Sequence, residues 1–447
     1  MAEFLKKTVK PSGGNYTSLE ACMNANEQDL TGDGWFTVEI DGTWSSADTS
    51  AVTIHNYTTT ASDYINIYTT AAARHDGKGS LDTDKYRIVN GTAFAAAINI
   101  GDNYVTITGL QITTYTGFAY GEVGLNIGQN QTGILIDKCF CHVKYDSNDK
   151  GGSTIAMAYA GTVEVRNTIA VQTGTGNAIS AYSTEGTKNI NNCIAIAYGS
   201  NAILTNADYG TLTIRNTYAS SGTTTAFSTV DATLTTCASD DGSQSTATVA
   251  YDTSTFTNVT AGSEDFHLVA GSSLINAGTD LSATFTDDID GTTRPTGAGT
   301  WDIGADEYAS STYVYTRGDY ADLPTDDSDL ETAFTEANYT TVSTDDTNRV
   351  DQTATNQYAI FKFKDKNTNS TDLMTVTWNG QSTTAPSSSI VKLQIYDRTQ
   401  AQWEDLDSDN TTGANTDFDL TADITTELDH YYDASSWISC RVWQDDL

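Results

Sequence analysis

A short repeated pattern constrains the fold of this chain more than any other sequence feature. In each copy an apolar residue ends a β-type alternation, one further residue follows, and then comes a bend position that is most often Asn. The apolar residues of six copies are 29, 29, 25, 24 and 20 positions apart and are Ile107, Ile136, Val165, Ile190, Ile214 and Leu234. A fixed strand core with variable spacing is typical of stacked coils joined by loops of different length. The pattern therefore predicts stacked β-coils, in which Asn or Gly takes a left-handed conformation at the bend.

The position after each bend supports the same alignment. It holds side chains of similar volume, which we expect to form one inward-facing column: Leu110, Cys139, Thr168, Cys193, Thr217 and Cys237. Because neighbouring coils lie about 4.8 Å apart, the column cysteines would be roughly 10 Å from one another, beyond disulfide reach. The sequence therefore predicts free, buried thiols that fill the core.

The next position of each copy should face outward, because side chains alternate along a strand. It is occupied by apolar residues in four copies, namely Phe140, Ile169, Ile194 and Tyr218. Such a stripe in contact with water would be unusual for a monomer. We expect another subunit or a loop of the same chain to cover it, and a homotrimer is the expected assembly.

These repeats resemble those of right-handed parallel β-helix proteins, the pectin-lyase-like group that includes many phage tail spikes and fibres. A second group of segments is similar to the terminal coil of many bacterial and phage β-helix proteins: 265–268, 273–278, 288–291, 294–295 and 302–308. Within it, Arg294 lies among acidic residues that include Asp302, and we expect it to lock the last turn through charge-assisted hydrogen bonds. The resemblance implies fold much better than function.

The chain divides into three predicted parts, all of them β-rich. Residues 1–60 are expected to form an N-terminal capping module, in which 17–20 is a capping box that opens a short helix. Residues 61–308 would form the parallel β-helix. Residues 309–447 alternate as antiparallel strands at 358–364, 390–396 and 437–443, with hairpins expected at Asn379-Gly380 and between 397 and 402. We predict a C-terminal β-sandwich, similar to a jelly roll.

Charge narrows the range of partners. Lys and Arg number 22 against 58 Asp and Glu, for a formal net charge of −36. A field of this sign repels phosphate backbones and anionic lipids, which argues against nucleic acid or a membrane surface as a partner. The first residues lack the apolar run of a signal peptide, and no stretch approaches the roughly 20 apolar residues of a membrane span. We expect a virion protein, or one that is extracellular or at the cell surface.

Two acidic loops resemble calcium-binding loops. Residues 29–34 lack the final ligand, because Glu39 falls one position short, and residues 405–409 lack the required glycine. Solvated acidic loops are the favoured interpretation, so no cofactor is predicted, with Ca²⁺ as the alternative.

Catalytic candidates are few. Asp137, Glu164 and Arg166 fall on the outward side of the predicted coils, where a polysaccharide lyase or a glycoside hydrolase would carry its acids and bases. A structural ladder of ion pairs explains the same residues, and we favour it. We therefore assign no catalytic residue and keep a polysaccharide lyase or a glycoside hydrolase as the alternative.

The C-terminal third holds four of the seven tryptophans, and Trp403, just past a hairpin tip, is the best candidate for an exposed sugar-binding ring. We expect a structural or adhesive appendage of a phage particle (a head or tail fibre, spike or decoration protein), with a C-terminal sandwich that docks to other virion proteins or binds cell-surface polysaccharide. The alternatives are a polysaccharide depolymerase and a bacterial surface adhesin or sheath protein.

Overall fold

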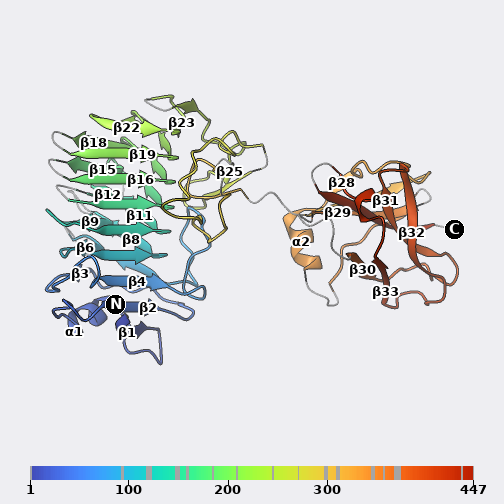
Figure 1. Ribbon diagram of the computed structural model, residues 1–447, viewed down its shortest axis with the longest axis horizontal. Helices are drawn as coiled ribbons and strands as arrows, with labels where there is room; N and C mark the ends of the chain where they lie inside the picture. The colour runs from blue at the N-terminus through green and yellow to red at the C-terminus, as the bar shows by residue number, and fades with distance from the viewer. Residues whose placement is uncertain are drawn as a thin grey trace. The chain divides into compact units, whose positions relative to one another are not determined.

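The chain folds into two β-rich units. The computed structural model describes residues 3–91, 95–116, 123–145, 152–157, 161–183, 186–207, 210–243, 246–269, 271–295, 301–308, 313–343, 348–355, 358–366, 374–433 and 436–445. The first unit spans Met1–Tyr308 and contains a right-handed parallel β-solenoid of about seven turns. The second unit spans Ala309–Leu447 and is built of antiparallel strands. The predicted β-helix and sandwich are both confirmed (Figure 1).

The first sheet of the solenoid contains the predicted repeats. Over the described residues it runs through nine parallel strands: β1 (Glu3–Val9), β2 (Trp35–Ile40), β4 (Ile65–Thr69), β7 (Val105–Thr108), β10 (Ile134–Asp137), β13 (Val163–Arg166), β16 (Thr187–Asn191), β19 (Thr211–Arg215) and β22 (Ala232–Thr235). The predicted register is confirmed at every step, because each member of the apolar column pairs with the next, from Ile107 through to Leu234. These side chains lie in one continuous core.

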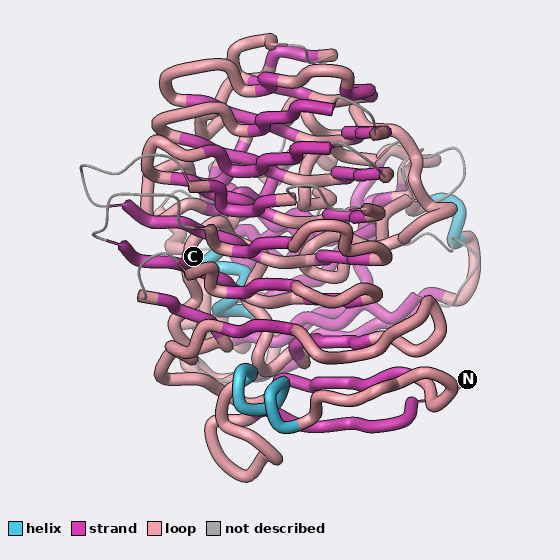
Figure 2. The backbone as a smooth tube through the Cα atoms, turned by 90° about the vertical axis from the view of Figure 1, so that its left-hand side faces the viewer, coloured by secondary structure: helices cyan, strands magenta, loops and turns pink. Residues whose placement is uncertain are grey.

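Two further parallel sheets complete each coil. The second runs, among the described residues, through β5 (Arg87–Asn90), β8 (Gln111–Thr116), β11 (Phe140–Tyr145), β14 (Ile169–Gln172), β17 (Ile194–Ala197), β20 (Tyr218–Ser221), β23 (Ala238–Ser239) and β24 (Ala247–Thr248). The third runs through β3 (Val52–Ile54), β6 (Ile98–Ile100), β9 (Leu125–Ile127), β12 (Ser153–Ala156), β15 (Asn177–Ser183), β18 (Ile203–Ala207) and β21 (Phe227–Ser228). Figure 2 shows these coils stacked one above another.

The bend between the first and second sheets is left-handed in all six predicted copies. The φ angle lies between 45° and 77° at Gly109, Lys138, Asn167, Asn192, Asn216 and Thr236. Asn and Gly tolerate this conformation, so their recurrence in the sequence has a backbone cause. The predicted bend conformation is confirmed, and we call these six positions the bend column.

The N-terminal region is part of the solenoid. Strands β1, β2 and β3 all precede residue 60 and pair within the solenoid sheets, so the expected boundary at residue 60 does not separate a module. Helix α1 (Leu19–Ala25) contacts β1 and β3 at this end of the stack (Figure 2). Its buried side chains are Leu19, Cys22 and Met23. Its N-cap is Ser18, whose hydroxyl accepts from the Ala21 amide, one residue after the predicted cap.

Residues 250–308 do not add another coil to the stack. They form a segment, which we call the cover, that lies on the outer face of the second sheet and includes a short antiparallel pair, β25 (Phe256–Asn258) and β26 (Asp265–Leu268). The cover buries the predicted outward column of Phe140, Ile169, Ile194 and Tyr218, together with its own apolar side chains. The expectation of a terminal coil is therefore wrong, while a loop of the same chain does cover the apolar stripe.

The second unit has two layers. Its larger sheet has the order β28 (Thr332–Ala333), β27 (Tyr313–Tyr320), β29 (Tyr358–Lys366), β34 (Trp437–Asp445), β31 (Val391–Asp397) and β32 (Gln402–Asp409). The pair β30 (Met374–Gly380) and β33 (Phe418–Ile424) packs against it through two apolar clusters. Short helices are α2 (Glu336–Val342) and the 3₁₀ turn η1 (Leu428–His430). The predicted hairpin tip between 397 and 402 is confirmed. The hairpin predicted at Asn379-Gly380 is wrong, because both residues pair with β33 within strand β30.

Candidate functional site

The acid at the centre of the predicted catalytic column is held by its neighbours. Asp137 ends β10 and Arg166 ends β13, in register on adjacent coils. The Arg166 Nη2 atom donates to Asp137 Oδ2 at 2.9 Å, and Asn167 Nδ2 donates to the other carboxylate oxygen at 3.2 Å. The Arg166 guanidinium also lies 4.9 Å from the centroid of the Phe285 ring of the cover. Both oxygens of the buried Asp137 accept hydrogen bonds from the next coil, so the carboxylate joins two coils, and Arg166 links them to the cover.

Glu164 belongs to a second ladder. Its Oε1 atom accepts from Asn191 Nδ2 at 3.0 Å, and Asn191 Oδ1 accepts from Arg215 Nε at 3.0 Å. These side chains connect β13, β16 and β19 across three successive coils. The arrangement is a polar ladder along the stack. Among the described residues, no hydrogen bond links Glu164 to Asp137.

The column of thiols and hydroxyls lies in the interior of the solenoid. Cys139, Cys193 and Cys237 are fully buried and free. Thr168 and Thr217 between them donate to the carbonyls of Arg166 and Arg215 and accept from the amides of Cys139 and Cys193. Burial raises the pKa of the Cys139 and Cys193 thiols to about 12 and that of Cys237 to about 11. Thiols kept in the protonated form are poor nucleophiles, which suits a role in packing.

The residues expected to lock the last turn instead hold the cover together and attach it to the solenoid. Arg294 is fully buried, and its Nη1 atom donates to Glu307 Oε2 at 2.6 Å. Its Nη2 atom donates to Asn167 Oδ1 in the bend column and to the carbonyls of Gly304 and Ala305. Asp302 accepts from the amides of Asn276 and Tyr308, each at 2.6 Å. The bend column is therefore also the attachment line of the cover.

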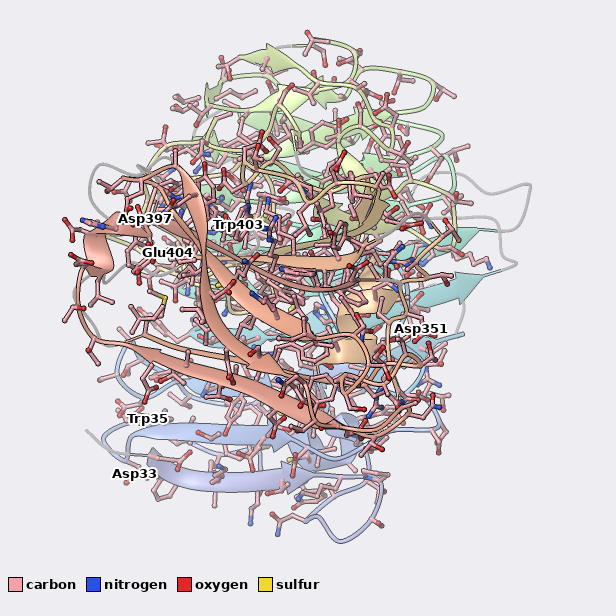
Figure 3. All side chains as sticks on the ribbon, turned by 90° about the vertical axis from the view of Figure 1, so that its right-hand side faces the viewer. Asp33, Trp35, Asp351, Asp397, Trp403 and Glu404 are labelled. Atoms are coloured by element: carbon pink, nitrogen blue, oxygen red, sulfur yellow. The ribbon has the colours of Figure 1, made fainter. Side chains whose placement is uncertain are left out.

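The predicted sugar-binding tryptophan is packed against its neighbours. Trp403 lies on β32 beside Glu404 (Figure 3). The Arg441 guanidinium lies 4.2 Å from its ring centroid, and the Tyr396 ring meets it edge-on at 5.2 Å. Its indole Nε1 donates to the carbonyl of Asp326. Residues 324–329 run over this face of the sheet, so Trp403 is partly buried.

A more open aromatic surface lies elsewhere in the second unit. We call it the aromatic cluster; it consists of Tyr313, Tyr315, Phe334, Tyr339, Phe361 and Phe363, whose neighbouring ring centroids are 5.0–6.4 Å apart. Tyr313 is 42% exposed, and Val342 at the end of α2 is 42% exposed. Phe363 also contacts the core beneath β30 and β33, so the cluster continues the buried face of the larger sheet to its edge. The exposed part of the surface is the Tyr313 ring, while the Tyr315 hydroxyl donates to Asp365 Oδ1 within the protein.

Helix α2 holds this surface in place. Thr335 precedes the helix, and its hydroxyl accepts from the Asn338 amide while Asn338 Oδ1 accepts from the Thr335 amide. This reciprocal cap fixes the start of the helix. One residue later, the Tyr339 hydroxyl accepts from the Tyr315 amide at 2.9 Å, at the edge of strand β27. Sequence reasoning missed the cluster because it weighed tryptophans, although the alternation Tyr313-Val-Tyr315 places two tyrosines on one strand face.

The comparisons with known proteins reach only the second unit. A family model described as "Uncharacterized protein, C-terminal domain" matches residues 309–446. A search of curated proteins and a search of solved structures give no match. Within the part of the chain that the structure describes, none of the helices has the length and apolar character needed to cross a membrane.

Proposed function

We propose that this protein is a non-enzymatic surface appendage, a pectin-lyase-like β-helix of the kind found on phage particles, whose second unit binds cell-surface glycan through the aromatic cluster. The observation that carries the proposal is the exposed ring of Tyr313 at the edge of a packed group of aromatic side chains. Flat aromatic rings bind sugars because their apolar faces pack against the C–H groups of the sugar ring.

The solenoid fits the other half of this proposal. Its polar ladders and buried thiols are the contacts of a stiff support that repeats along one axis, where each coil contacts only its neighbours. A repeating support of this kind suits an appendage mounted on a particle or a cell. The net charge of −36 favours a neutral glycan over a strongly acidic one. Attachment to other virion proteins, and a homo-oligomeric rod, belong to the same proposal.

Binding of the full-length protein to immobilised neutral and acidic polysaccharides tests the glycan site. We expect binding to a neutral glycan, weakened at least tenfold in Tyr313→Ala and in Tyr339→Ala. Tyr313→Phe should lose much less, because the ring remains. The matched control is Phe4→Ala, since Phe4 is an equally exposed aromatic (46%) on the solenoid and should not affect binding.

The outcomes separate the site from the function. If Tyr313→Ala and Phe4→Ala both bind like the wild type while binding itself is strong, the glycan site lies elsewhere. If none of the polysaccharides binds, the adhesive function is wrong. Release of reducing ends from any of these polysaccharides would favour the depolymerase instead.

A further inference from the structure

Three side chains of the cover bring one imidazole and two carboxylates together. They are His267 on β26, Asp290 in the loop that follows the cover's strand pair, and Asp306 in the terminal motif. One ligand atom from each lies within 4.8 Å of the others, and among the described residues this is the one group of at least three such side chains. Among the described residues, the acidic loops at 29–34 and 405–409 contain no such group of three.

The distances suit a single ion. His267 Nε2 lies 2.9 Å from Asp290 Oδ2. Two ligands at right angles, each about 2.1 Å from one metal ion, lie about 3 Å apart. Asp290 is exposed and His267 is partly exposed, so water can reach the remaining coordination positions.

Each ligand is oriented by a contact outside the group. His267 Nδ1 lies 2.5 Å from Asp265 Oδ1, an arrangement that fixes the imidazole and leaves Nε2 to face the two other ligands. Asp290 lies against the backbone of Gly77 in the solenoid, where an added Cβ would be only 2.0 Å from Oδ1. The ligand positions are therefore fixed from both the cover and the solenoid.

Asp306 is the most buried of the three side chains. Its side chain belongs to a residue that is only 8% exposed, and Oδ2 accepts from the Leu268 amide at 2.8 Å. No donor among the described residues contacts its other oxygen. Burying a carboxylate is costly unless its charge is paired, and a cation bound to this group would pair it.

We propose that His267, Asp290 and Asp306 bind a divalent first-row transition ion of the zinc or manganese kind, which clamps β26, the 287–291 loop and the terminal motif of the cover. The mixed donor set carries the choice of ion, because imidazole suits transition metals whereas Ca²⁺ and Mg²⁺ prefer oxygen ligands alone. Asp265 acts as a positioning residue through His267.

Titration calorimetry of the chelator-treated full-length protein with Zn²⁺, Mn²⁺ and, for comparison, Ca²⁺ tests the site. We expect one equivalent of Zn²⁺ or Mn²⁺ with micromolar affinity or better in 150 mM salt, and a higher melting temperature of the first unit. His267→Gln and Asp306→Asn should weaken binding at least 100-fold. Asp265→Asn should weaken it 10- to 100-fold while Co²⁺ still gives the visible spectrum of nitrogen ligation.

The control variant is Asp33→Asn, an exposed acid of the 29–34 loop, which should bind as the wild type does. His267→Gln is the decisive variant if Asp306→Asn fails to fold, because His267 is partly exposed; far-UV circular dichroism checks both. Equal weak binding of all three ions, unchanged by these substitutions, would overturn the proposal. So would the absence of binding, in which case His267 is an ion-paired clasp between Asp265 and Asp290.

Discussion

Replacing Asn192 by Gly and by Ala should separate two roles of the bend column. Asn192 is fully buried with φ near 48°. Its Nδ2 atom donates to the carbonyls of Asp302 and Gly304 in the cover, at 3.1 and 3.2 Å, and its Oδ1 accepts from Asn216 Nδ2 at 3.2 Å. Gly keeps the left-handed conformation but removes the amide, so three buried hydrogen bonds are lost. At about 1 kcal/mol for each bond, and with partners left unpaired, the variant should lose about 2–4 kcal/mol of unfolding free energy.

Asn192→Ala should lower the unfolding free energy by about 1 kcal/mol more than Asn192→Gly, because the Cβ of Ala is unfavourable in the left-handed region. The assay is equilibrium urea unfolding of the full-length protein, with hydrogen exchange of peptides from 271–308 to assign the transition to the first unit. The control is Asn130, which is also left-handed (φ 64°) but exposed. Asn130→Gly should change the unfolding free energy by less than about 0.5 kcal/mol, and Asn130→Ala should change it by about 1 kcal/mol. If Asn192→Gly unfolds at the same urea concentration as the wild type, the amide ladder does not hold the cover.

Three further outcomes follow from buried groups of the solenoid. Asp137→Asn should lower the unfolding free energy of the first unit by about 2–3 kcal/mol, because Arg166 loses its ionic partner. Viscosity and reducing-end assays on cell-surface polysaccharides should detect no cleavage by the wild type or the variant. Cleavage by the wild type that disappears in the variant would contradict this. A thiol-reactive reagent should leave Cys139, Cys193 and Cys237 unmodified in the native protein and should react with them after unfolding. A native disulfide among these three cysteines would be inconsistent with the register of the coils. Burial lowers the pKa of His142 to about 4, so the stability that neutral His142 contributes is present above pH 6.5 and is lost as the pH falls towards 4. Between pH 7 and pH 4, the melting temperature of the wild type should therefore fall by more than that of His142→Gln. Equal decreases would show that His142 does not cause the pH dependence.

The solenoid could be predicted from the sequence because its constraints are local and repeat. Stacking places equivalent positions of successive coils in one column, so the column from Ile107 to Leu234 could be aligned despite unequal loops. The left-handed bends could be predicted for a similar reason, because this backbone conformation restricts which residues occur at the bend position. In the second unit, the long alternating strands at 358–366, 391–397 and 437–445 were also predictable.

What could not be predicted depends on contacts between distant parts of the chain. Asn192 meets Gly304 across 112 positions, and the pattern of the terminal motif does not reveal whether it extends the stack or folds back on it. The grouping of His267, Asp290 and Asp306 follows from that fold-back, so neither the partners nor the distances were available from the motif. The hairpin prediction at Asn379-Gly380 was wrong for the same reason. Its partner strand β33 starts 38 positions after Gly380, and pairing with this distant strand overrides the local turn preference.

The cover also changes what is expected of assembly. Phe140, Ile169, Ile194 and Tyr218 are at most 1% exposed beneath it, so this stripe gives no reason for a partner subunit while the cover is closed. The homotrimer stays a prediction, and this stripe no longer supports it. The stripe becomes available only if the cover opens.

Arg294→Met should open the cover. The substitution keeps an apolar stem but leaves Glu307 without its cation and Asn167 Oδ1 without one donor, which should weaken closure by about 3–5 kcal/mol. Four apolar side chains on coils about 5 Å apart would then face water and favour self-association. In sedimentation velocity the wild type should keep one concentration-independent species, whereas the variant should form larger species as its concentration rises and should bind an apolar dye. Arg349→Met, an arginine of the second unit, is the control. If peptides from 271–308 exchange faster in Arg294→Met and the variant still sediments as the wild type does, the covered stripe does not drive association.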